Sequence, residues 1–473
     1  MTDARLSPAD WPTLAARIAA WLPAARWFGG KGSAPSAVTI HDAVPLPGGL
    51  ALVLVDVAGP AGTSPSRWVV PVDPASGADA AADGRFASWV VAAACGGRAF
   101  PGEHGRLVGA AITDGPAFAG ACRASPLGGD ASNTSLLVVP TDAAAGHGGM
   151  VLKLLRRATA GENPEVEVGR FLAESTRWRG TPRLLAFLRY EPDGDDRPAE
   201  APSTIATLHA FAPGCDGAWE RGLALAAAAE GSVTAALTPL AGKLGRVTAE
   251  MHEALASRPD IPAFAPRAAT RAGREALAER LRARAEGVFA RLGRAGLPPE
   301  TASRVGRLTG ARAAVVRVLS AVARAGTTAA DIRVHGDYHL GQVLVDASGS
   351  TLLPIDFEGE PARPLAERRE PSSAAKDVAG MCRSFDYLLR QAAGARGRAP
   401  EDPAPLVAAF LDGYRDAARG AAWWPAEPRE ESALLDAFVL DKALYELAYE
   451  LDNRPDWVAV PLGALETLLT IFG

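Results

Sequence analysis

The sequence has little cysteine, no long apolar run and no excess of positive charge. Its 473 residues include four cysteines at separations that match no metal-binding motif, so we expect reduced thiols in a cytoplasmic protein. No stretch of about 18 residues is apolar enough to cross a bilayer, and the first residues lack the pattern of a signal peptide. The formal net charge is −5, whereas a dedicated nucleic-acid binder carries a basic excess. We therefore expect neither membrane insertion nor nucleic-acid binding.

Lysine is also scarce, although positive charge is not. Of 49 basic residues only five are lysines, which leaves 44 arginines. A chain with this bias replaces lysine by arginine wherever a positive charge alone is sufficient. A compact ammonium group and a planar guanidinium group are not equivalent at a tight site. The remaining lysines are therefore candidates for functional positions, and they are Lys31, Lys153, Lys243, Lys376 and Lys442.

The order of apolar patterns divides the chain into three parts. Residues 1–90 combine an amphipathic helix at 8–22 with strand-like runs, which indicates a small α+β unit that we expect to act as a cap. Residues 91–212 are mostly strand-like, and residues 213–473 are mostly helical with one polar hairpin. The long helical periods lie at 232–256, 267–292, 301–325, 372–391, 403–418 and 430–452. A chain of this length is expected to form two or three domains, and a β lobe joined to an α lobe makes a cleft.

The hairpin at 333–361 concentrates polar groups between two apolar runs. Its first half has the pattern H-x-D-x-x-x-x-Q, and its second half contains IDFE. A kinase needs an acid that accepts the proton of the incoming hydroxyl, together with an amide and a second carboxylate that hold Mg²⁺ on the phosphates. The spacing therefore predicts Asp337 as the base, and Gln342 and Asp356 as the metal ligands. The alternative is a polar hairpin whose acids are merely solvated.

Two segments upstream meet the other needs of a kinase. The loop at 128–135 is rich in small, hydrogen-bonding residues before a strand, a composition that suits the binding of phosphates. Its candidate contacts are Ser132, Asn133, Thr134 and Ser135. The segment at 206–214 follows the β lobe, and we expect it to meet the adenine of ATP near His209 and Phe211. The alternative for the loop at 128–135 is a simple turn, because loops of its composition are common as turns.

Lys153 lies in an apolar strand-like run and is the candidate for contact with the nucleotide phosphates. A charge in such a run is costly unless it is paired. The helix that follows offers Glu167 as the preferred partner and Glu165 as the second choice. The alternative is a strand lysine whose ammonium reaches solvent.

Four motifs together resemble a known family. HGDYHLGQVL, IDFEGEP, DVAGMCRSFDY and the N-terminal RWFGGKG resemble bacterial maltokinases, and the whole chain looks more like the related bacterial glucosamine kinases, within the aminoglycoside-phosphotransferase-like kinases. The resemblance implies an α+β, bilobal protein-kinase-like fold with an N-terminal cap subdomain, and ATP and Mg²⁺ as cofactors. It also implies the same roles for Asp337, Gln342, Asp356 and Lys153. His335 and His339 stand where the family has supporting residues, so we interpret them as structural.

The helix expected near residues 440–457 is the candidate acceptor site. One side carries an apolar stripe, and the other carries acids, tyrosines and a retained lysine. A sugar needs a flat apolar surface together with hydrogen-bonding groups, so we interpret this polar side as the contact for a small-molecule sugar. Its candidates are Lys442, Tyr445, Glu446, Tyr449, Glu450 and Arg454. The alternative is a solvated helix face.

The leading functional hypothesis is transfer of the γ-phosphoryl group of ATP to the 6-hydroxyl of glucosamine. A maltokinase and an aminoglycoside phosphotransferase are the competing enzymes, and a nucleotide-binding pseudokinase is the competitor from another class. The intact set of kinase residues argues against the pseudokinase. No obligate protein partner is evident. We interpret residues 377–390 as scaffold, with an internal ion pair between Arg383 and Asp386.

Overall fold

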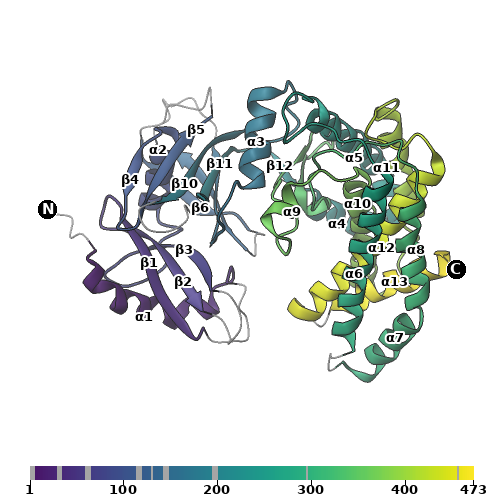
Figure 1. The fold of residues 1–473 in the computed structure, drawn as a ribbon, viewed down its shortest axis with the longest axis horizontal. Coiled ribbons are helices and arrows are strands. Elements are labelled where there is room, and N and C mark those ends of the chain that lie inside the picture. Colours follow the sequence, from purple (N-terminus) through teal and green to yellow (C-terminus); the bar gives the residue numbers. More distant parts are fainter. Residues whose placement is uncertain are drawn as a thin grey trace. The chain divides into compact units, whose positions relative to one another are not determined.

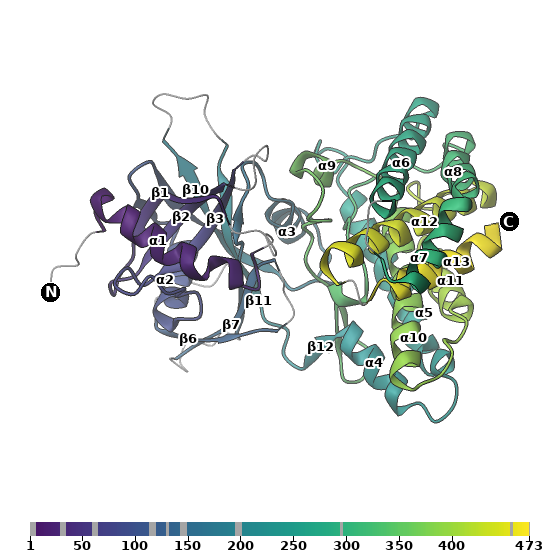
Figure 2. The same ribbon diagram turned by 90° about the horizontal axis from the view of Figure 1, so that it is seen from below.

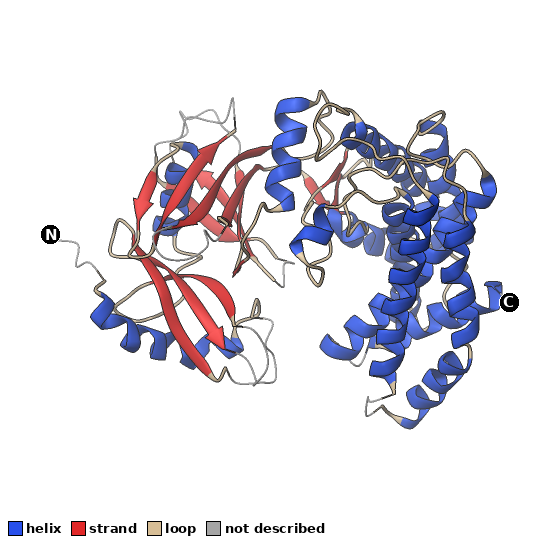
Figure 3. Cartoon of the chain, viewed as in Figure 1, coloured by secondary structure: helices blue, strands red, loops and turns tan. Residues whose placement is uncertain are grey.

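The computed structural model describes residues 6–28, 35–58, 65–112, 120–128, 132–141, 149–193, 201–293, 297–454 and 457–472. The chain forms two compact units, one of Met1–Ser175 with Pro182–Pro213, and one of Thr176–Thr181 with Gly214–Gly473. The predicted start of the helical part at residue 213 stays a prediction, although the second unit also resumes at Gly214. The division at residue 90 stays a prediction, because both predicted parts lie in the first unit. Figure 3 shows strands dominating the first unit and helices the second.

The first unit begins with an antiparallel sheet that carries a helix. Its strands have the order β1-β2-β3-β9, and they span Ala37–Pro45, Ala51–Ala58, Ser66–Val72 and Arg157–Ala158. Helix α1 (Trp11–Trp21) lies along this sheet (Figure 1). Leu14 and Ile18, one turn apart, pack with Trp68 in the core between helix and sheet. The predicted helix at 8–22 and the strands after it are therefore confirmed.

A second, seven-stranded sheet completes the first unit. Its order is β4-β5-β10-β11-β8-β7-β6, with every neighbouring pair antiparallel. The strands span Ala99–Pro101, Gly105–Ala111, Leu184–Pro192, Ser203–Ala210, Met150–Leu154, Thr134–Pro140 and Cys122–Pro126. Helix α2 (Gly84–Cys95) packs on this sheet, and α3 (Pro164–Ser175) follows β8 and β9 in the chain (Figure 2). Lys153 on β8 and His209 on β11 thus belong to one sheet.

The second unit is mostly helical. Its small antiparallel sheet joins β12, β13 and β14, at Cys215–Gly217, Val343–Asp346 and Leu352–Pro354. Strands β13 and β14 are the predicted polar hairpin. The helices are α4 (Ala218–Ala228), α5 (Val233–Ala256), α6 (Arg271–Leu292), α7 (Pro299–Gly310), α8 (Arg312–Ala321), α9 (Leu365–Arg369), α10 (Ala375–Ala395), α11 (Ala404–Ala417), α12 (Pro428–Asn453) and α13 (Ala459–Phe472).

One helix prediction was wrong. The period at 301–325 was expected to form a single helix, but the structure divides it at Ala311 into α7 and α8. Gly310 ends the first helix, and glycine is a weak helix former. The spacing of apolar residues, from which the helix was predicted, is not changed by such a residue. The four cysteines are free thiols. Within the described ranges, no helix combines the length and the apolar character needed to span a membrane.

Candidate active site

The candidate catalytic loop, which carries Asp337, is held by a buried acid at the start of α10. The two carboxylate oxygens of Asp377 accept hydrogen bonds from the backbone N–H groups of His335, at 2.7 Å, and Gly336, at 2.9 Å. Gly336 has φ of +89°, a conformation that favours glycine. A Cβ on Gly380 would lie 2.4 Å from the carbonyl oxygen of Tyr338, so the loop rests directly on the helix backbone. The predicted scaffold role of this segment matches this geometry.

Asp377 is itself fixed from α5. His252 Nε2 lies 3.0 Å from Asp377 Oδ2, and His252 Nδ1 lies 2.8 Å from the hydroxyl of Tyr414. Because a carboxylate only accepts, His252 Nε2 must carry a proton and donate it to Asp377. Burial opposes the charge of Asp377, but His252 and the backbone N–H groups hold its pKa below the usual range. The sequence did not reveal this contact, because residues more than 100 positions apart make it.

Asp337 forms an ion pair with a lysine of α12. Lys442 Nζ lies 2.7 Å from Asp337 Oδ1 and 3.5 Å from Glu360 Oε1. The side chains of Asp337 and Lys442 are 17% and 15% exposed, whereas that of Glu360 is 4% exposed. Burial raises the pKa of Asp337, but Lys442 outweighs it, and the pKa lies well below the usual range. The ammonium of Lys442 is thus engaged by the candidate base, and its contact with a sugar stays a prediction.

The hairpin brings the two candidate metal ligands together. Val343 pairs with Pro354 at the open end of the hairpin, and the backbone N–H of Ile355 donates to the carbonyl oxygen of Gln342 at 2.9 Å, so Asp356 follows directly beside Gln342. Gln342 Nε2 donates to Asp356 Oδ2 at 3.0 Å. Asp356 has φ of +67°, and among the described residues it is the sole non-glycine in the left-handed region. Such conformations are concentrated at functional sites.

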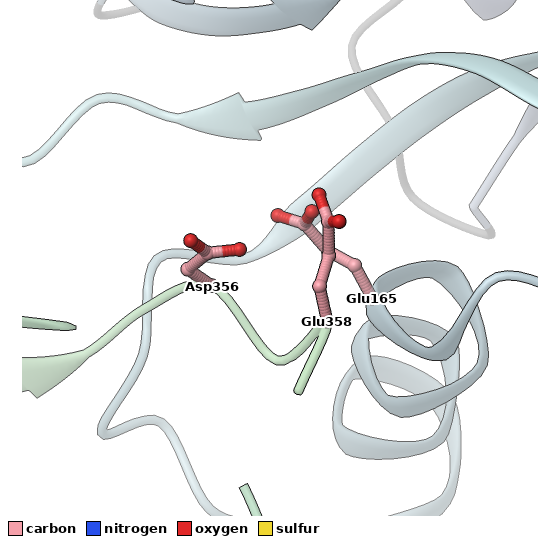
Figure 4. A group of neighbouring side chains, drawn as sticks. All are labelled: Glu165, Asp356 and Glu358. Carbon is pink, nitrogen blue, oxygen red and sulfur yellow. The ribbon is translucent and has the colours of Figure 1, made fainter. Parts of the chain in front are cut away.

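The donor set suits a magnesium ion. An amide oxygen and a carboxylate are ligands that Mg²⁺ accepts, usually with water and nucleotide phosphates completing the shell. Gln342 and Asp356 lie close enough to share one ion, and rotation of the Gln342 amide presents its oxygen in place of Nε2. Figure 4 shows Asp356 and Glu358 on the loop that follows β14. The residues present therefore fit the predicted ion.

Both histidines of the loop support the backbone. His335 Nε2 contacts the carbonyl oxygen of Ile355 at 2.8 Å, and its ring lies 4.8 Å from that of Phe357. His335 thus links the loop of Asp337 to the loop of Asp356. His339 Nδ1 accepts from the N–H of Gly341 at 3.1 Å, and burial lowers the pKa of this histidine. These contacts agree with the structural role predicted for both residues.

In the first unit, Lys153 is paired with Glu165. The ammonium lies 3.0 Å from Glu165 Oε2, and His209 Nε2 lies 3.1 Å from Glu165 Oε1. Burial opposes the charge of Glu165, but Lys153 and His209 hold its pKa well below the usual range. The preference for Glu167 over Glu165 was therefore wrong. Residues two apart on a helix point about 200° apart, so only one of them faces the strand, and the sequence does not show which.

The histidine predicted to meet adenine has a different neighbour. His209 turns its ring toward Glu165, which stands in the first turn of α3 (Figure 4). Phe211 donates its backbone N–H to the carbonyl oxygen of Gly149 at 2.9 Å, which links the end of β11 to the start of β8. Adenine contact at this segment, including that of His209, stays a prediction, and the ring of His209 is also a partner of the Lys153–Glu165 pair.

The predicted phosphate loop is only partly described, because residues 129–131 lie outside the described ranges. Ser135 pairs with Lys153 across β7 and β8, beside the predicted phosphate contact. Ser132 and Asn133 precede that strand. The hydroxyl oxygen of Thr134 accepts a hydrogen bond from Arg156 Nε at 2.8 Å, and Arg156 also binds Asp79 at 2.7 Å. Thr134 is thus part of the internal framework as well as a predicted phosphate contact.

The acids of the candidate acceptor helix already have cations. Glu446 Oε2 binds Arg383 at 2.8 Å, and Arg383 binds Asp386 at 2.7 Å, as predicted for the latter pair. Glu450 Oε1 accepts from Tyr387 at 2.8 Å and from Arg454 at 2.6 Å.

The aromatic residues of this face are partly stacked. The guanidinium of Arg454 lies over the rings of Tyr449 and Trp457, at 5.6 and 5.0 Å. Tyr449 is exposed, whereas burial raises the pKa of Tyr445 to about 12. The acids of this face are therefore paired, and their contact with a sugar stays a prediction. Sequence reasoning missed Arg383 and Tyr387 as their partners.

Comparisons with known proteins agree with the predicted family. Residues 21–117 match the model of the maltokinase N-terminal cap domain. A glucosamine kinase of Streptacidiphilus jiangxiensis is 33% identical over 279 residues, which are 57% of this chain and 58% of that protein. A glucosamine kinase of Mycolicibacterium smegmatis (strain ATCC 700084 / mc(2)155) is 30% identical over 287 residues, 57% of this chain and 64% of that protein. Less than two thirds of either relative is therefore matched.

Solved structures cover nearly the whole chain. A glucosamine kinase in complex with glucosamine, ADP and inorganic phosphate has a TM-score of 0.60 at 25% identity, covering 96% of this chain and 99% of that one. Another glucosamine kinase structure has a TM-score of 0.59 at 26% identity, covering 96% and 98%. The chain is thus similar to glucosamine kinases in sequence and in fold, and its N-terminal part matches the maltokinase cap domain. The predicted α+β, protein-kinase-like fold with an N-terminal cap is confirmed.

Proposed function

We propose that this chain is an ATP-dependent sugar kinase that transfers the γ-phosphoryl group to the 6-hydroxyl of glucosamine. The observation that carries the proposal is the polar hairpin of the second unit. There, a partly exposed Asp337 carboxylate and the adjacent Gln342–Asp356 pair are held by buried contacts to α5 and α10. The relatives and solved neighbours named above support the same chemistry. Because the proposed reaction consumes ATP and acts on a small sugar, we assign this protein to the cytoplasm.

Each residue then has a defined task. Asp337 accepts the proton of the sugar hydroxyl as the new oxygen–phosphorus bond forms and the bond to the β-phosphate oxygen breaks. Mg²⁺, held by Gln342 and Asp356, supplies charge neutralisation on the phosphates. Lys153 of the first unit is assigned to the same phosphates, with Glu165 fixing its ammonium. Asp377 acts indirectly, because it sets the backbone from which Asp337 projects.

The amine of glucosamine requires an acid, and Glu450 is the best supported candidate. Its Oε1 is held by Tyr387 and Arg454, but within the described part of the chain its buried Oε2 has no hydrogen-bond partner. An unsatisfied buried carboxylate oxygen is costly, and a protonated amine would satisfy it with a charge-assisted hydrogen bond. Glu446 is weaker because Arg383 binds it. Tyr445, Tyr449 and Arg454 complete the proposed sugar face.

A maltokinase is the second candidate, and one observation favours it. Arg383, Arg454 and Lys442 already neutralise the acids of this face, so the site does not demand a positively charged acceptor. A neutral disaccharide would bind such a surface through stacking and hydroxyl hydrogen bonds. The match to the maltokinase cap domain is compatible with either acceptor.

A coupled assay of ADP release tests the proposal. The chain is assayed with ATP and Mg²⁺ against glucosamine, glucose, N-acetylglucosamine and maltose at one pH, with Asp337→Asn as the control for contaminating activity. We expect the highest kcat/KM for glucosamine, at least about tenfold above glucose, because glucose lacks the charged hydrogen bond. Preference for maltose would transfer the assignment to the second candidate. ADP release that no sugar stimulates would refute both.

A further inference from the structure

We propose that Lys442 is a positioning residue for the catalytic base, an inference that rests on the kinase function proposed above. Its ammonium lies 2.7 Å from Asp337 Oδ1 and 3.5 Å from Glu360 Oε1, and therefore bridges two carboxylates from different loops. It also lies 4.8 Å from the centre of the Tyr445 ring, within the range of a cation–π contact. Three neighbours thus fix one ammonium, which in turn orients Asp337.

Both ends of this bridge are anchored independently of Asp337. The residue before Lys442, Asp441, forms two hydrogen bonds with Arg284 of α6, at 2.9 and 2.7 Å, which fixes α12 at this turn. Glu360 is bound by Arg363 on its other side and is almost fully buried. Asp337, by contrast, is the partner that reaches solvent. Lys442 and Glu360 therefore form a fixed frame that holds Asp337 in place, and Asp337 is not needed to hold them.

The contact selects one carboxylate oxygen. Lys442 binds Oδ1, and no described residue donates to Oδ2. Oδ2 is therefore the oxygen left for the acceptor hydroxyl. A carboxylate bound at one oxygen presents the other in a defined direction, and a displacement of about 1 Å at a reacting group costs about a hundredfold in rate.

The bridge needs lysine rather than arginine. A single ammonium reaches both carboxylates with donors that rotate freely, whereas a guanidinium is larger and planar, with donors in a fixed fork. This chain uses arginine for 44 of its 49 basic residues but keeps lysine here. Lys442→Arg should therefore not restore the function of the wild-type residue.

Kinetic measurements distinguish a positioning role of Lys442 from a direct contact between Lys442 and the sugar. Lys442→Met should lower kcat about ten- to a hundredfold, with the KM for ATP within about twofold of the wild type. Lys442→Arg should recover less than half of this loss. Lys243→Met is the matched control, because the ammonium of Lys243 donates to the carbonyl oxygen of Gly349 at the hairpin turn, away from Asp337 in the sequence, and the variant should keep normal kinetics. A rise in sugar KM with unchanged kcat would overturn the positioning role and return Lys442 to sugar binding.

The pH profile provides a second readout. The charged groups around Asp337 are Lys442 and Tyr445 on α12, His335 and His339 on its own loop, and Glu360 on the next loop. Removing the cation leaves Asp337 and Glu360 facing each other, so the acid limb of kcat should move to higher pH in Lys442→Met. Glu360→Gln removes the like charge and should move this limb in the opposite direction. A purely structural role would shift neither limb.

A measurement without turnover keeps the two proposals distinguishable. The ¹³C carboxyl signal of Asp337, identified by its loss in Asp337→Asn, is titrated in the wild type and in Lys442→Met. A higher midpoint in Lys442→Met supports the bridge even if no sugar is phosphorylated, in which case only the proposed function fails. An unchanged midpoint overturns the bridge whatever the activity. If Lys442→Met does not fold, the same titration in Glu360→Gln decides, with a lower midpoint expected.

Discussion

Each of the two units contains a lysine that is paired with a candidate site carboxylate, and the pairs Lys153–Glu165 and Lys442–Asp337 differ in burial. Lys153 and Glu165 in the first unit are 8% and 5% exposed, and His209 closes the pair from the other side. Lys442 and Asp337 in the second unit are 15% and 17% exposed. A closed pair fixes the geometry of a cation, whereas a more open pair keeps one carboxylate oxygen accessible. The difference suits a fixed phosphate contact in one unit and a reacting base in the other.

The largest expected effect comes from the open pair. Asp337→Asn should lower kcat at least about 10²–10⁴-fold, because the amide cannot accept the hydroxyl proton. The thermal unfolding temperature should change little, since the side chain is not fully buried. A folded variant with near-normal kcat would show that Asp337 is not the base.

The closed pair should respond mainly in stability. Lys153→Met leaves the buried Glu165 without its principal cation, which should lower the free energy of unfolding by about 3–5 kcal/mol. It should also raise the KM for ATP. Chemical denaturation and ATP kinetics on the same preparation measure both effects.

The assignment of Glu165 over Glu167 can be tested with a matched pair of variants. Glu165→Gln should weaken ATP binding and lower the stability of the fold more than Glu167→Gln does, because the carboxylate of Glu165 lies 3.0 Å from Lys153 Nζ and 3.1 Å from His209 Nε2. The opposite order would restore the original preference. Denaturation midpoints and ATP KM values for the two variants, measured side by side, decide the question.

Asp377, which holds the backbone of the loop that carries Asp337, should show an effect of intermediate size. Asp377→Asn replaces an acceptor of three hydrogen bonds with a side chain that has only one accepting oxygen. We expect kcat to fall about tenfold to a hundredfold through displacement of Asp337, with less change in sugar KM. Equal loss of all activity through unfolding, visible by circular dichroism, would make the role of Asp377 structural only.

The smallest expected effect lies far from either pair. Glu401 accepts backbone hydrogen bonds from Val233 and Thr234 at the start of α5, and these hold its pKa at about 2. A lowered pKa in the folded state adds stability above the unfolded value of about 4.3 that is lost as pH falls toward 2. Glu401→Gln should therefore lower Tm by about 1–2 °C at pH 7 and by less at pH 3. An equal shift at both pH values would contradict this account.

The local parts of the site could be predicted from the sequence. Asp337, Gln342 and Asp356 lie within 20 residues and are flanked by strand-like runs, so the hairpin alone brings Gln342 to Asp356. The contacts across long sequence separations could not be predicted, because helical periodicity shows which face of a helix is polar but not what it meets. Lys442 was thus interpreted as a sugar contact, and the sequence did not show that its ammonium binds Asp337, which is 105 positions away.

Helix direction was the other source of error. The sequence placed two acids in the first turn of α3, and only the orientation of that helix against β8 decides that Glu165 meets Lys153. The break between α7 and α8 was missed for a similar reason, because the apolar period continues across Gly310. Both errors concern where an element starts or points. Helices α2, α4 and α13 were not predicted from the sequence at all.

Direct identification of the product tests the central claim. The chain is incubated with ATP, Mg²⁺ and an equimolar mixture of glucosamine and maltose, and the product is examined by ³¹P–¹H correlation spectroscopy. The account predicts a phosphate coupled to the C6 methylene protons of glucosamine, and its loss with Asp337→Asn. A phosphate coupled to the anomeric proton of maltose, or ADP formation without any sugar phosphate, would contradict it.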